Sequence, residues 1–242
     1  MRIGIAGITG RMGKLIAEAV PLAGATLAGG IGRGGDLAAL ARTCDVVIDF
    51  TRAETVIRHA TILKEAGIAW VLGTTGLAAT DEAAVDETAR RIPVLAAANF
   101  SPGVNLVLAL AEMLGAALSA STHDAEILEM HHRQKIDAPS GTALALGHSV
   151  ARGRNVPLQD VMVEARHGET GARKEGEIGF ASLRGGQIPG SHSLLFTSDM
   201  EQIALTHHAF DRRIFADGAV RAALWLHGRD PGRYSMRDML GI

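Results

Sequence analysis

The chain has 242 residues, of which 47% are hydrophobic and 21% are charged, and its net charge at pH 7 is −2. This length suits one large domain or two small ones with a sizeable core, and the composition excludes a disordered chain. The charge balance argues against a nucleic-acid partner, which would need an excess of basic residues. The single cysteine, Cys44, excludes an internal disulfide and a zinc site built from thiolates.

No segment has the pattern of a signal peptide or a membrane span. The N-terminal residues lack a basic stretch followed by a long apolar run. The longest apolar stretch, 104–118, is interrupted by Asn105 and Glu112 and is shorter than a typical span. We therefore expect a cytoplasmic protein with no membrane partner.

A glycine-rich turn lies between the first predicted strand, Arg2–Ala6, and the first predicted helix, Lys14–Val20. Such a turn brings the N–H groups of a helix start to the pyrophosphate of a dinucleotide. The glycines of this turn are spaced Gly-x-x-Gly-x-x-Gly, which differs from the usual Gly-x-Gly-x-x-Gly. The predicted cofactor contacts in this turn are Gly7, Ile8, Thr9, Gly10, Arg11 and Met12.

The second predicted strand, Thr26–Ile31, ends in Gly32 and Arg33. At this place in a dinucleotide fold, an acid binds the ribose 2′-hydroxyl of NADH, and an arginine binds the 2′-phosphate of NADPH. Gly32 stands where the acid is expected, and the next acid, Asp36, opens a helix. Arg33 is therefore a predicted cofactor contact, and NADPH should be accepted at least as well as NADH. The alternative is that Arg33 is only a solvated loop residue.

Strands and helices alternate through the rest of the first hundred residues. The predicted strands Cys44–Asp49, Ala69–Leu72 and Val94–Ala97 are separated by the predicted helices Ala53–Ala66 and Asp81–Arg90. This alternation predicts a parallel sheet with its ligand outside the carboxyl ends of the strands. The loops that follow these strands carry Phe50 and Thr51, then Gly73, Thr74 and Thr75, and then Ala98, Asn99 and Phe100. Phe50 and Thr51 are predicted cofactor contacts.

The pattern changes after the predicted helix Gly103–Ala120. Strand-like pieces recur between glycine-rich turns rather than helices, which predicts a mixed open sheet. These pieces are Asp124–His131, Val161–Ala165, Ile178–Leu183, Ser193–Phe196 and Gln202–His207.

The final segment, Arg212–Ile242, returns to helical spacing and is expected to pack on the first half. The predicted fold class is α/β: a Rossmann-type parallel-sheet nucleotide domain plus an α+β domain with a mixed open sheet. We expect a discontinuous dinucleotide-binding domain, 1–100 and 212–242, and a substrate-binding and oligomerisation domain, 101–211. Arg212 or Arg213 is expected to approach the cofactor.

Residues 126–143 read Glu-Ile-Leu-Glu-Met-His-His-Arg-Gln-Lys-Ile-Asp-Ala-Pro-Ser-Gly-Thr-Ala. Histidine titrates near neutral pH, which suits His131 to general acid catalysis, and Lys135 supplies a nearby positive charge. Ser140 or Thr142 marks the start of a predicted helix, where N–H groups and the helix dipole favour a carboxylate or phosphate. A histidine pair alone is most often structural, but the density of this stretch predicts a cationic, proton-active anion pocket.

This stretch resembles the dihydrodipicolinate reductase family, whose pattern E-I-x-E-x-H-x-x-x-K-x-D-x-P-S-G-T-A it fills at every fixed position. The resemblance implies NAD(P)H-dependent reduction of 4-hydroxy-tetrahydrodipicolinate to tetrahydrodipicolinate in diaminopimelate and lysine biosynthesis. It also implies a homotetramer assembled through the open sheet. It implies that His131 and Lys135 are catalytic, and that His132, Ser140, Gly141 and Thr142 bind the dicarboxylate substrate. The residues implied at the nicotinamide are Gly73, Thr74, Thr75, Ala97, Ala98, Asn99 and Phe100.

Other functions share parts of this pattern. A different two-domain NAD(P)-dependent amino-acid dehydrogenase, or a non-enzymatic Rossmann nucleotide sensor, would need the first hundred residues but not the cluster at 131–142. The ten histidines raise the possibility of a metal site. However, the adjacent pairs His131/His132 and His207/His208 would point to opposite faces of a strand, and no metal-binding motif accompanies them. We predict no metal.

Overall fold

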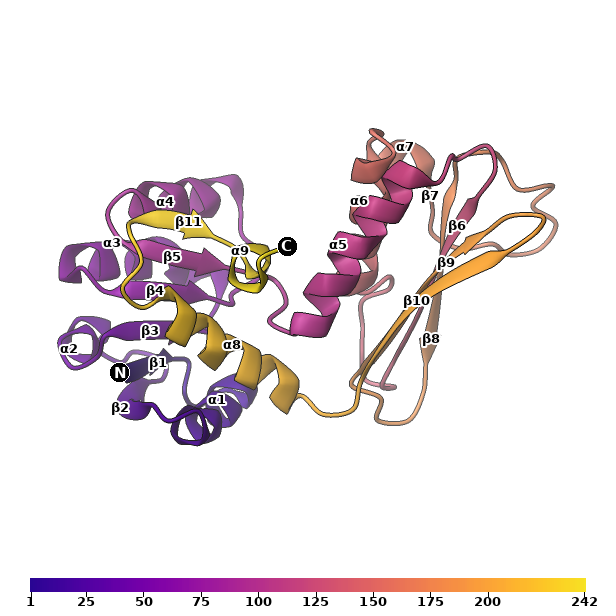
Figure 1. The fold of residues 1–242 in the computed structure, drawn as a ribbon. Helices are drawn as coiled ribbons and strands as arrows, with labels where there is room; N and C mark the ends of the chain where they lie inside the picture. The colour runs from indigo at the N-terminus through magenta and orange to yellow at the C-terminus, as the bar shows by residue number, and fades with distance from the viewer. The chain divides into compact units, whose positions relative to one another are not determined.

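Two separate sheets organise the chain, and each belongs to its own unit (Figure 1). The structure is a computed structural model that describes all residues, 1–242. Contacts divide it into a first unit, Met1–Pro102 with Arg213–Ile242, and a second unit, Gly103–Arg212. No helix in either unit is long and apolar enough to cross a membrane.

The first unit contains a parallel six-stranded sheet in the order β11-β5-β4-β3-β1-β2. Because every strand runs the same way, all the carboxyl ends lie at one edge. The chain order reverses at β1 and β3, and this is where ligands bind in doubly wound sheets. The strands are β1 (Arg2–Ala6), β2 (Thr26–Ile31), β3 (Val46–Asp49), β4 (Ala69–Leu72), β5 (Pro93–Ala96) and β11 (Gly232–Tyr234).

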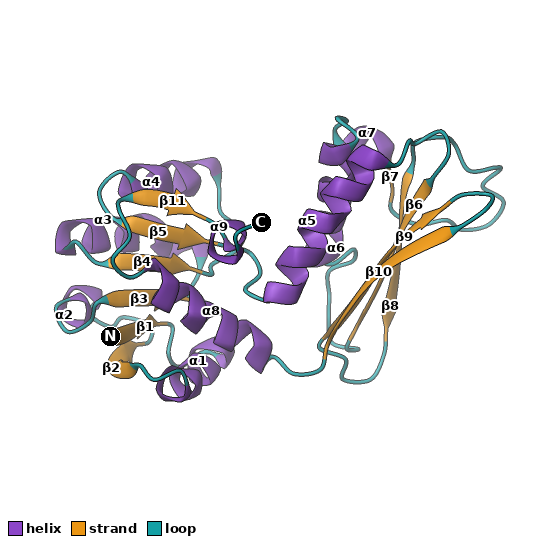
Figure 2. Cartoon of the chain, in the orientation of Figure 1, coloured by secondary structure: helices purple, strands orange, loops and turns teal.

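Helices cover both faces of this sheet (Figure 2). One face packs against α1, α8 and α9, and the other against α2, α3 and α4. The central strands β3 and β4 are buried at every residue, which explains why they are continuous apolar runs rather than alternating ones. The helices are α1 (Arg11–Leu22), α2 (Leu37–Ala41), α3 (Val56–Ala66), α4 (Ala79–Ala89), α8 (Arg213–Leu226) and α9 (Met236–Leu240), with a 3-10 turn η1 (Ala53–Thr55) before α3.

The last segment of the chain completes the first unit. A Cβ at Gly218 of α8 would lie 1.8 Å from the carbonyl oxygen of Phe100, so this approach of the helix is possible only for glycine. The predicted helical segment Arg212–Ile242 also contains a strand, β11, which pairs with β5 at the sheet edge. Helical spacing did not reveal β11, because its residues Gly232–Tyr234 are too few to show alternation.

The second unit contains a mixed five-stranded sheet in the order β10-β9-β6-β8-β7. Strand β6 is parallel to β8 and antiparallel to β9. The predicted fold class, a Rossmann-type parallel sheet plus a mixed open sheet, is confirmed. The strands are β6 (Asp124–His131), β7 (Met162–Val163), β8 (Ile178–Arg184), β9 (Gly190–Thr197) and β10 (Gln202–Ala209), and the helices are α5 (Pro102–Ala117), α6 (Gly141–Gly153) and α7 (Leu158–Val161).

The expected strand Val161–Ala165 is wrong in extent, since the structure forms only the two-residue β7 after the single turn α7. Side chains from α5, α6 and α7 pack with one face of the sheet to form the core of the second unit. Burial alternates along β6, so Ile127, Glu129 and His131 point into the covered face, and Glu126 and Leu128 point away from it. The carboxylate of Glu129 and the imidazole of His131 are therefore two residues apart on the same face of β6.

Candidate active site

The end of β6 carries a buried cluster of charged side chains. Glu129 and His131 lie on the same face of the strand, and His131 Nδ1 lies 2.5 Å from Glu129 Oε2. Arg184, at the end of the neighbouring strand β8, donates to both Glu129 oxygens at 2.7 and 2.9 Å. The backbone N–H of Ser140 also donates to this carboxylate, at 3.2 Å. One carboxylate thus joins the strand end, the next strand and the start of α6.

Glu129 is anionic at neutral pH. Burial by itself raises the pKa of the carboxyl group, but hydrogen bonds from Arg184, Ser182 and His131 outweigh burial and hold the pKa at about 2. An ionised carboxylate only accepts hydrogen bonds, so Nδ1 of His131 must carry the proton between them. Nε2 of His131 is then the nitrogen available for proton exchange. A Cβ at Gly190 would lie 3.1 Å from this Nε2, so glycine leaves it room.

His131 titrates below the usual range of histidine. Burial lowers the pKa of its imidazole, while the hydrogen bond and charge of Glu129 oppose this effect. The positive charges of Lys135 and Arg184 lower the pKa further. An anion arriving beside the ring would act in the opposite direction and favour the protonated form.

A second histidine supports the cluster from β9. His192 is paired in register with Glu129, and its ring meets His131 edge-on at 5.0 Å. Its Nε2 lies 3.0 Å from the hydroxyl oxygen of Ser140. Burial, followed by the charge of His131, lowers the pKa of His192 to about 4, so this ring is neutral.

The start of α6 lies beside this cluster. The hydroxyl oxygen of Ser140 accepts from the N–H of Ala143 at 3.2 Å, so Ser140 is the N-cap and its hydroxyl is already engaged. Apart from its chain neighbours and the backbone of its own helix, nothing lies within 4 Å of the place where a Cβ of Gly141 would be. Gly141 and Thr142 therefore begin the helix at an open position, to which the helix dipole attracts an anion.

His132 presents an unused donor. Arg212 donates to its Nε2 at 3.2 Å, so the proton of the neutral ring is on Nδ1, which is buried and has no partner. The expectation that Arg212 or Arg213 approaches the cofactor stays a prediction, and the contact that Arg212 makes here is with His132 of the same unit. A buried donor without an acceptor suits a carboxylate ligand.

Lys135 is held by its neighbour. Its ammonium group lies 2.9 and 2.8 Å from the two oxygens of Asp137, which lowers the pKa of that carboxyl. The Lys135 side chain is 19% exposed and Asp137 is 56% exposed, so a ligand carboxylate can reach the lysine and compete with Asp137.

In the first unit, a cavity of about 490 Å³ opens at the carboxyl ends of β1, β2 and β3. Gly7 has a φ of +91°, and a Cβ there would lie 2.7 Å from the carbonyl oxygen of Phe50. A Cβ at Gly13 would lie 2.1 Å from the carbonyl oxygen of Gly7, so α1 approaches β1 as closely as a dinucleotide turn requires. Of the predicted cofactor residues, the cavity brings together Gly7, Thr9, Gly10, Arg33, Phe50 and Thr51.

The other predicted cofactor residues lie nearby. Ile8 and Met12 pack on the core, and Arg11 begins α1 on the surface. The loops after β4 and β5 carry Gly73, Thr74 and Thr75, and Ala97, Ala98, Asn99 and Phe100.

The Phe50 ring connects these loops. It lies 5.4 Å from the Phe100 ring, and a Cβ at Gly73 would lie 2.4 Å from its Cζ. The buried hydroxyl of Thr74 has no partner, so it remains able to bind a ligand. The close glycine turn and this unpaired hydroxyl fit a bound dinucleotide.

Sequence reasoning missed several residues around both sites. In the first unit, Arg52 and Arg58 line the cavity together with Arg33. In the second unit, Arg184 and His192 contact β6 from β8 and β9. Only Glu129 gave a signal in the sequence, because a residue two positions from His131 shares its face of a strand. No group of three or more His, Cys, Asp or Glu side chains is arranged to hold a metal ion.

Two family models match the chain. The model described as dihydrodipicolinate reductase, N-terminus, matches residues 1–100, and that described as dihydrodipicolinate reductase, C-terminus, matches residues 103–240. The chain belongs to the dihydrodipicolinate reductase family. Membership confirms the predicted family and a nicotinamide-dependent oxidoreductase, and it excludes the nucleotide sensor and the amino-acid dehydrogenase.

Relatives of this family match the chain along its whole length. A 4-hydroxy-tetrahydrodipicolinate reductase from Acidiphilium cryptum is 74% identical over 242 residues, covering 100% of this chain and 98% of the relative. One from Gluconacetobacter diazotrophicus is 59% identical, with the same coverage.

Solved structures share the fold. A dipicolinate-bound dihydrodipicolinate reductase from Paenisporosarcina sp. TG-14 has a TM-score of 0.76 at 23% identity, covering 97% of each chain. A DAP dehydrogenase of C. glutamicum in complex with DAP has a TM-score of 0.55 at 13% identity, covering 98% of this chain and 92% of that one. The fold alone therefore does not distinguish the reductase from a dehydrogenase.

Proposed function

We propose that the protein reduces 4-hydroxy-tetrahydrodipicolinate to tetrahydrodipicolinate with NAD(P)H, in diaminopimelate and lysine biosynthesis. The observation that carries the proposal is the orientation of His131 by an ionised Glu129, beside Lys135 and the start of α6. The names of the relatives support the substrate. Bound NAD(P)H supplies a hydride, and the net reaction also consumes a proton and releases a water.

The second unit binds the two carboxylates of the substrate. The Nδ1–H of His132 and the first turn of α6 at Gly141 and Thr142 are the receptors for one of them. Ser140 caps the helix and fixes the position of this turn. The ammonium group of Lys135 leaves Asp137 and binds the substrate as a charge partner.

His131 is the general acid. Its Nδ1–H is fixed on Glu129, so a proton delivered to the substrate leaves from Nε2. The dianionic substrate raises the pKa of the imidazole and so loads the acid only when substrate is bound. Glu129 remains ionised and stabilises the imidazolium, and Lys135 stabilises negative charge that develops on the substrate.

The first unit binds the cofactor. The turn from Gly7 to Met12 and the start of α1 receive the pyrophosphate, and Arg33 lies at the ribose. Phe50 and the loops at 73–75 and 97–100 hold the nicotinamide. We propose that both NADPH and NADH are accepted.

The open sheet of the second unit is the surface through which we propose that copies of the chain assemble. The face of β6 that carries Leu128 has no helix of this chain against it, and pairing such faces between copies would cover it. We propose a homotetramer, which size-exclusion chromatography with light scattering tests. Because the reaction draws on the cell's NAD(P)H, we also propose that the enzyme works in the cytoplasm.

The reaction is tested by following NADPH oxidation at 340 nm while a synthase generates the substrate from pyruvate and aspartate semialdehyde. His131→Ala and Lys135→Ala should each lower kcat by more than about a hundredfold and leave NADPH binding unchanged, because general acid catalysis contributes about 10²–10⁴-fold. A loss that fell wholly on NADPH affinity would contradict these roles. Absence of oxidation by the unaltered protein would contradict the function itself.

A further inference from the structure

The cavity at the carboxyl ends of β1, β2 and β3 has more positive charge than a dinucleotide pyrophosphate requires. Arg33 follows β2, Arg52 follows β3, and Arg58 lies in α3, and all three line this cavity. No aspartate or glutamate lines it. None of the three guanidinium groups makes an ion pair or a hydrogen bond within the protein. Because like charges without a counterion repel one another, the arrangement favours a ligand with more than one negative charge.

The neighbouring carboxylates are engaged elsewhere. Asp49, at the end of β3, is fully buried and accepts hydrogen bonds from Thr51 at 2.6 Å and His59 at 2.7 Å. Asp36 accepts from the N–H of Ala39 at 3.0 Å and caps α2. Neither acid lines the cavity.

The backbone also closes the usual position of such an acid. A Cβ at Gly32 would lie 3.1 Å from both Oγ1 and Cγ2 of Thr9, which is tighter than ordinary side-chain contacts. A side chain at position 32 would therefore require the Thr9 side chain to shift by a few tenths of an ångström. The cavity therefore carries no carboxylate for the ribose of NADH, and it carries two arginines besides Arg33.

We propose that Arg58, together with Arg52, completes with Arg33 a receptor for the 2′-phosphate of NADPH, which makes NADPH the favoured cofactor. The proposal rests on the cofactor binding proposed above and adds the group that the cofactor must carry. A 2′-phosphate carries a charge of about −1.5 to −2 at pH 7, and guanidinium groups bind it through paired N–H donors. Arg58 takes part because the first turns of α3 place it and His59 side by side at this cavity.

The test uses fragments that contain no nicotinamide. Binding of 2′-phospho-ADP-ribose and of ADP-ribose is measured by isothermal titration calorimetry for the unaltered protein, Arg58→Gln and Arg33→Gln/Arg58→Gln. Arg58→Gln should weaken the 2′-phosphorylated fragment about tenfold or more and ADP-ribose less than about twofold, because a hydrogen bond to a charged group is lost. The double variant should lose more, and the preference should fall as salt is raised. Arg91→Gln is the matched control, since Arg91 is exposed, unpaired and outside the cavity.

Equal losses for both fragments, or no loss for the phosphorylated one, would overturn the proposal. The outcome is independent of catalysis. A protein that prefers 2′-phospho-ADP-ribose but does not reduce the dicarboxylate would contradict only the proposed reaction. A reductase that binds the two fragments equally would contradict only the role of Arg58.

Discussion

Two glutamates on opposite faces of the same strand, β6, have different roles. Glu126 and Glu129 both lie on β6 and both pair with arginine, but their side chains are 34% and 1% exposed. Glu129 points into the covered face, where it orients His131. Glu126 points the other way and is held by Arg166 and Arg173.

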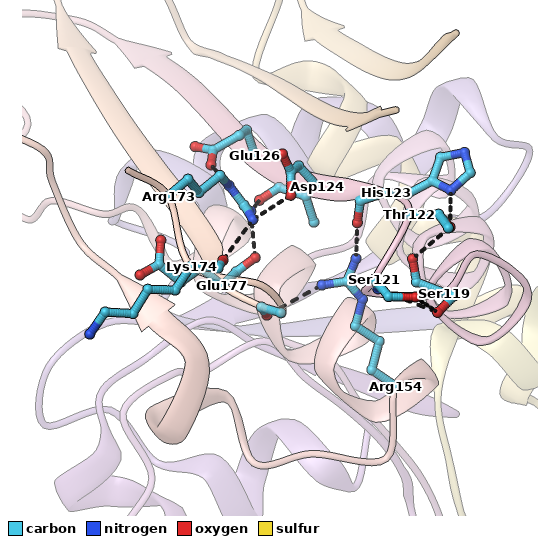
Figure 3. A network of polar contacts seen from close by, with 12 residues as sticks. Ser119, Ser121, Thr122, His123, Asp124, Glu126, Arg154, Arg173, Lys174 and Glu177 are labelled. Carbon is cyan, nitrogen blue, oxygen red and sulfur yellow. Dashed lines mark hydrogen bonds and ion pairs between the residues drawn. The ribbon is translucent and has the colours of Figure 1, made fainter. Parts of the chain in front are cut away.

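The network around Glu126 fastens a loop to the sheet (Figure 3). Arg173 lies between β7 and β8 and donates to Glu126 at 2.9 Å and to Asp124 at 2.6 Å. It also donates to the carbonyl oxygens of Ala125 and Glu177. This surface network is a structural clamp, whereas the buried pair at Glu129 also has a part in the reaction that we propose. The two can be separated by experiment.

The largest effect is expected from Glu129→Gln. This change keeps the shape but removes the charge that pairs with Arg184 and holds His131, and breaking a buried pair costs about 3–5 kcal/mol. Activity should fall more than about a hundredfold, because the imidazole loses its orientation. Glu126→Gln is the matched control and should cost about 1 kcal/mol or less with unchanged activity. Similar effects of both changes would refute the contrast.

Glu126 and Glu129 belong to the second unit, so the effect of these changes on stability must be measured by a probe in that unit. Both tryptophans, Trp70 and Trp225, lie in the first unit, so their fluorescence does not follow unfolding of the second. Hydrogen exchange of peptides that cover Asp124–His131, measured by mass spectrometry, reports the unit directly.

The pH dependence of the rate gives the next effect. Only protonated His131 can donate, so kcat/KM should fall as pH rises through the lowered pKa of the free enzyme, below the usual 6.5. Bound substrate raises this pKa, so the fall in kcat should lie at higher pH. Glu129→Gln removes a group that raises the pKa of His131, so the fall in kcat/KM should move to lower pH, and Glu126→Gln should leave it in place. An unmoved profile in Glu129→Gln would show that the carboxylate does not act through His131.

Acid unfolding gives a further test, which concerns the depressed pKa of Glu129. The folded pKa of Glu129 is depressed to about 2 from its ordinary 4.5. Its contribution to stability is therefore complete above about pH 4.5 and is lost as pH falls toward 2. Hydrogen exchange between pH 5 and 2.5 should show this loss in the unaltered protein and a weaker dependence in Glu129→Gln. The same slope in both proteins would contradict the depressed pKa.

The smallest effect is expected at the clamp. Arg173→Gln should lower the free energy of unfolding by about 1–2 kcal/mol, since the network is partly exposed but includes backbone acceptors. Raising the salt concentration from about 0.05 to 0.5 M should weaken the clamp and leave the buried pair nearly unchanged. Exchange in 164–177 measures this effect, and an equal response to salt at Glu129 would argue against a difference in burial.

The sequence predicted the parts of these sites that depend on local pattern. Strand-end residues such as Phe50 and Gly73 were found because parallel strands place ligands at their carboxyl ends. His131, Lys135 and Gly141 stood out because they are close together in sequence. Their catalytic and binding roles, and those given to the two domains, stay predictions.

The parts that escaped prediction depend on distant pairing. His192 meets Glu129 through the antiparallel register of β6 with β9, and Arg184 lies opposite His131 through the parallel register of β6 with β8. Neither register follows from periodicity within one strand. Arg58 was missed for a related reason, because its place at the cavity depends on how α3 packs on the sheet.

The pairing of β11 with β5 has a consequence for synthesis of the protein on the ribosome. The edge strand that completes the parallel sheet is translated only after the entire second unit, Gly103–Arg212, has been made. The second unit is contiguous in sequence, so all its strands have been synthesised while the sheet of the first unit still lacks β11. Until then the edge of β5 exposes unpaired backbone groups, which are open to pairing with another strand.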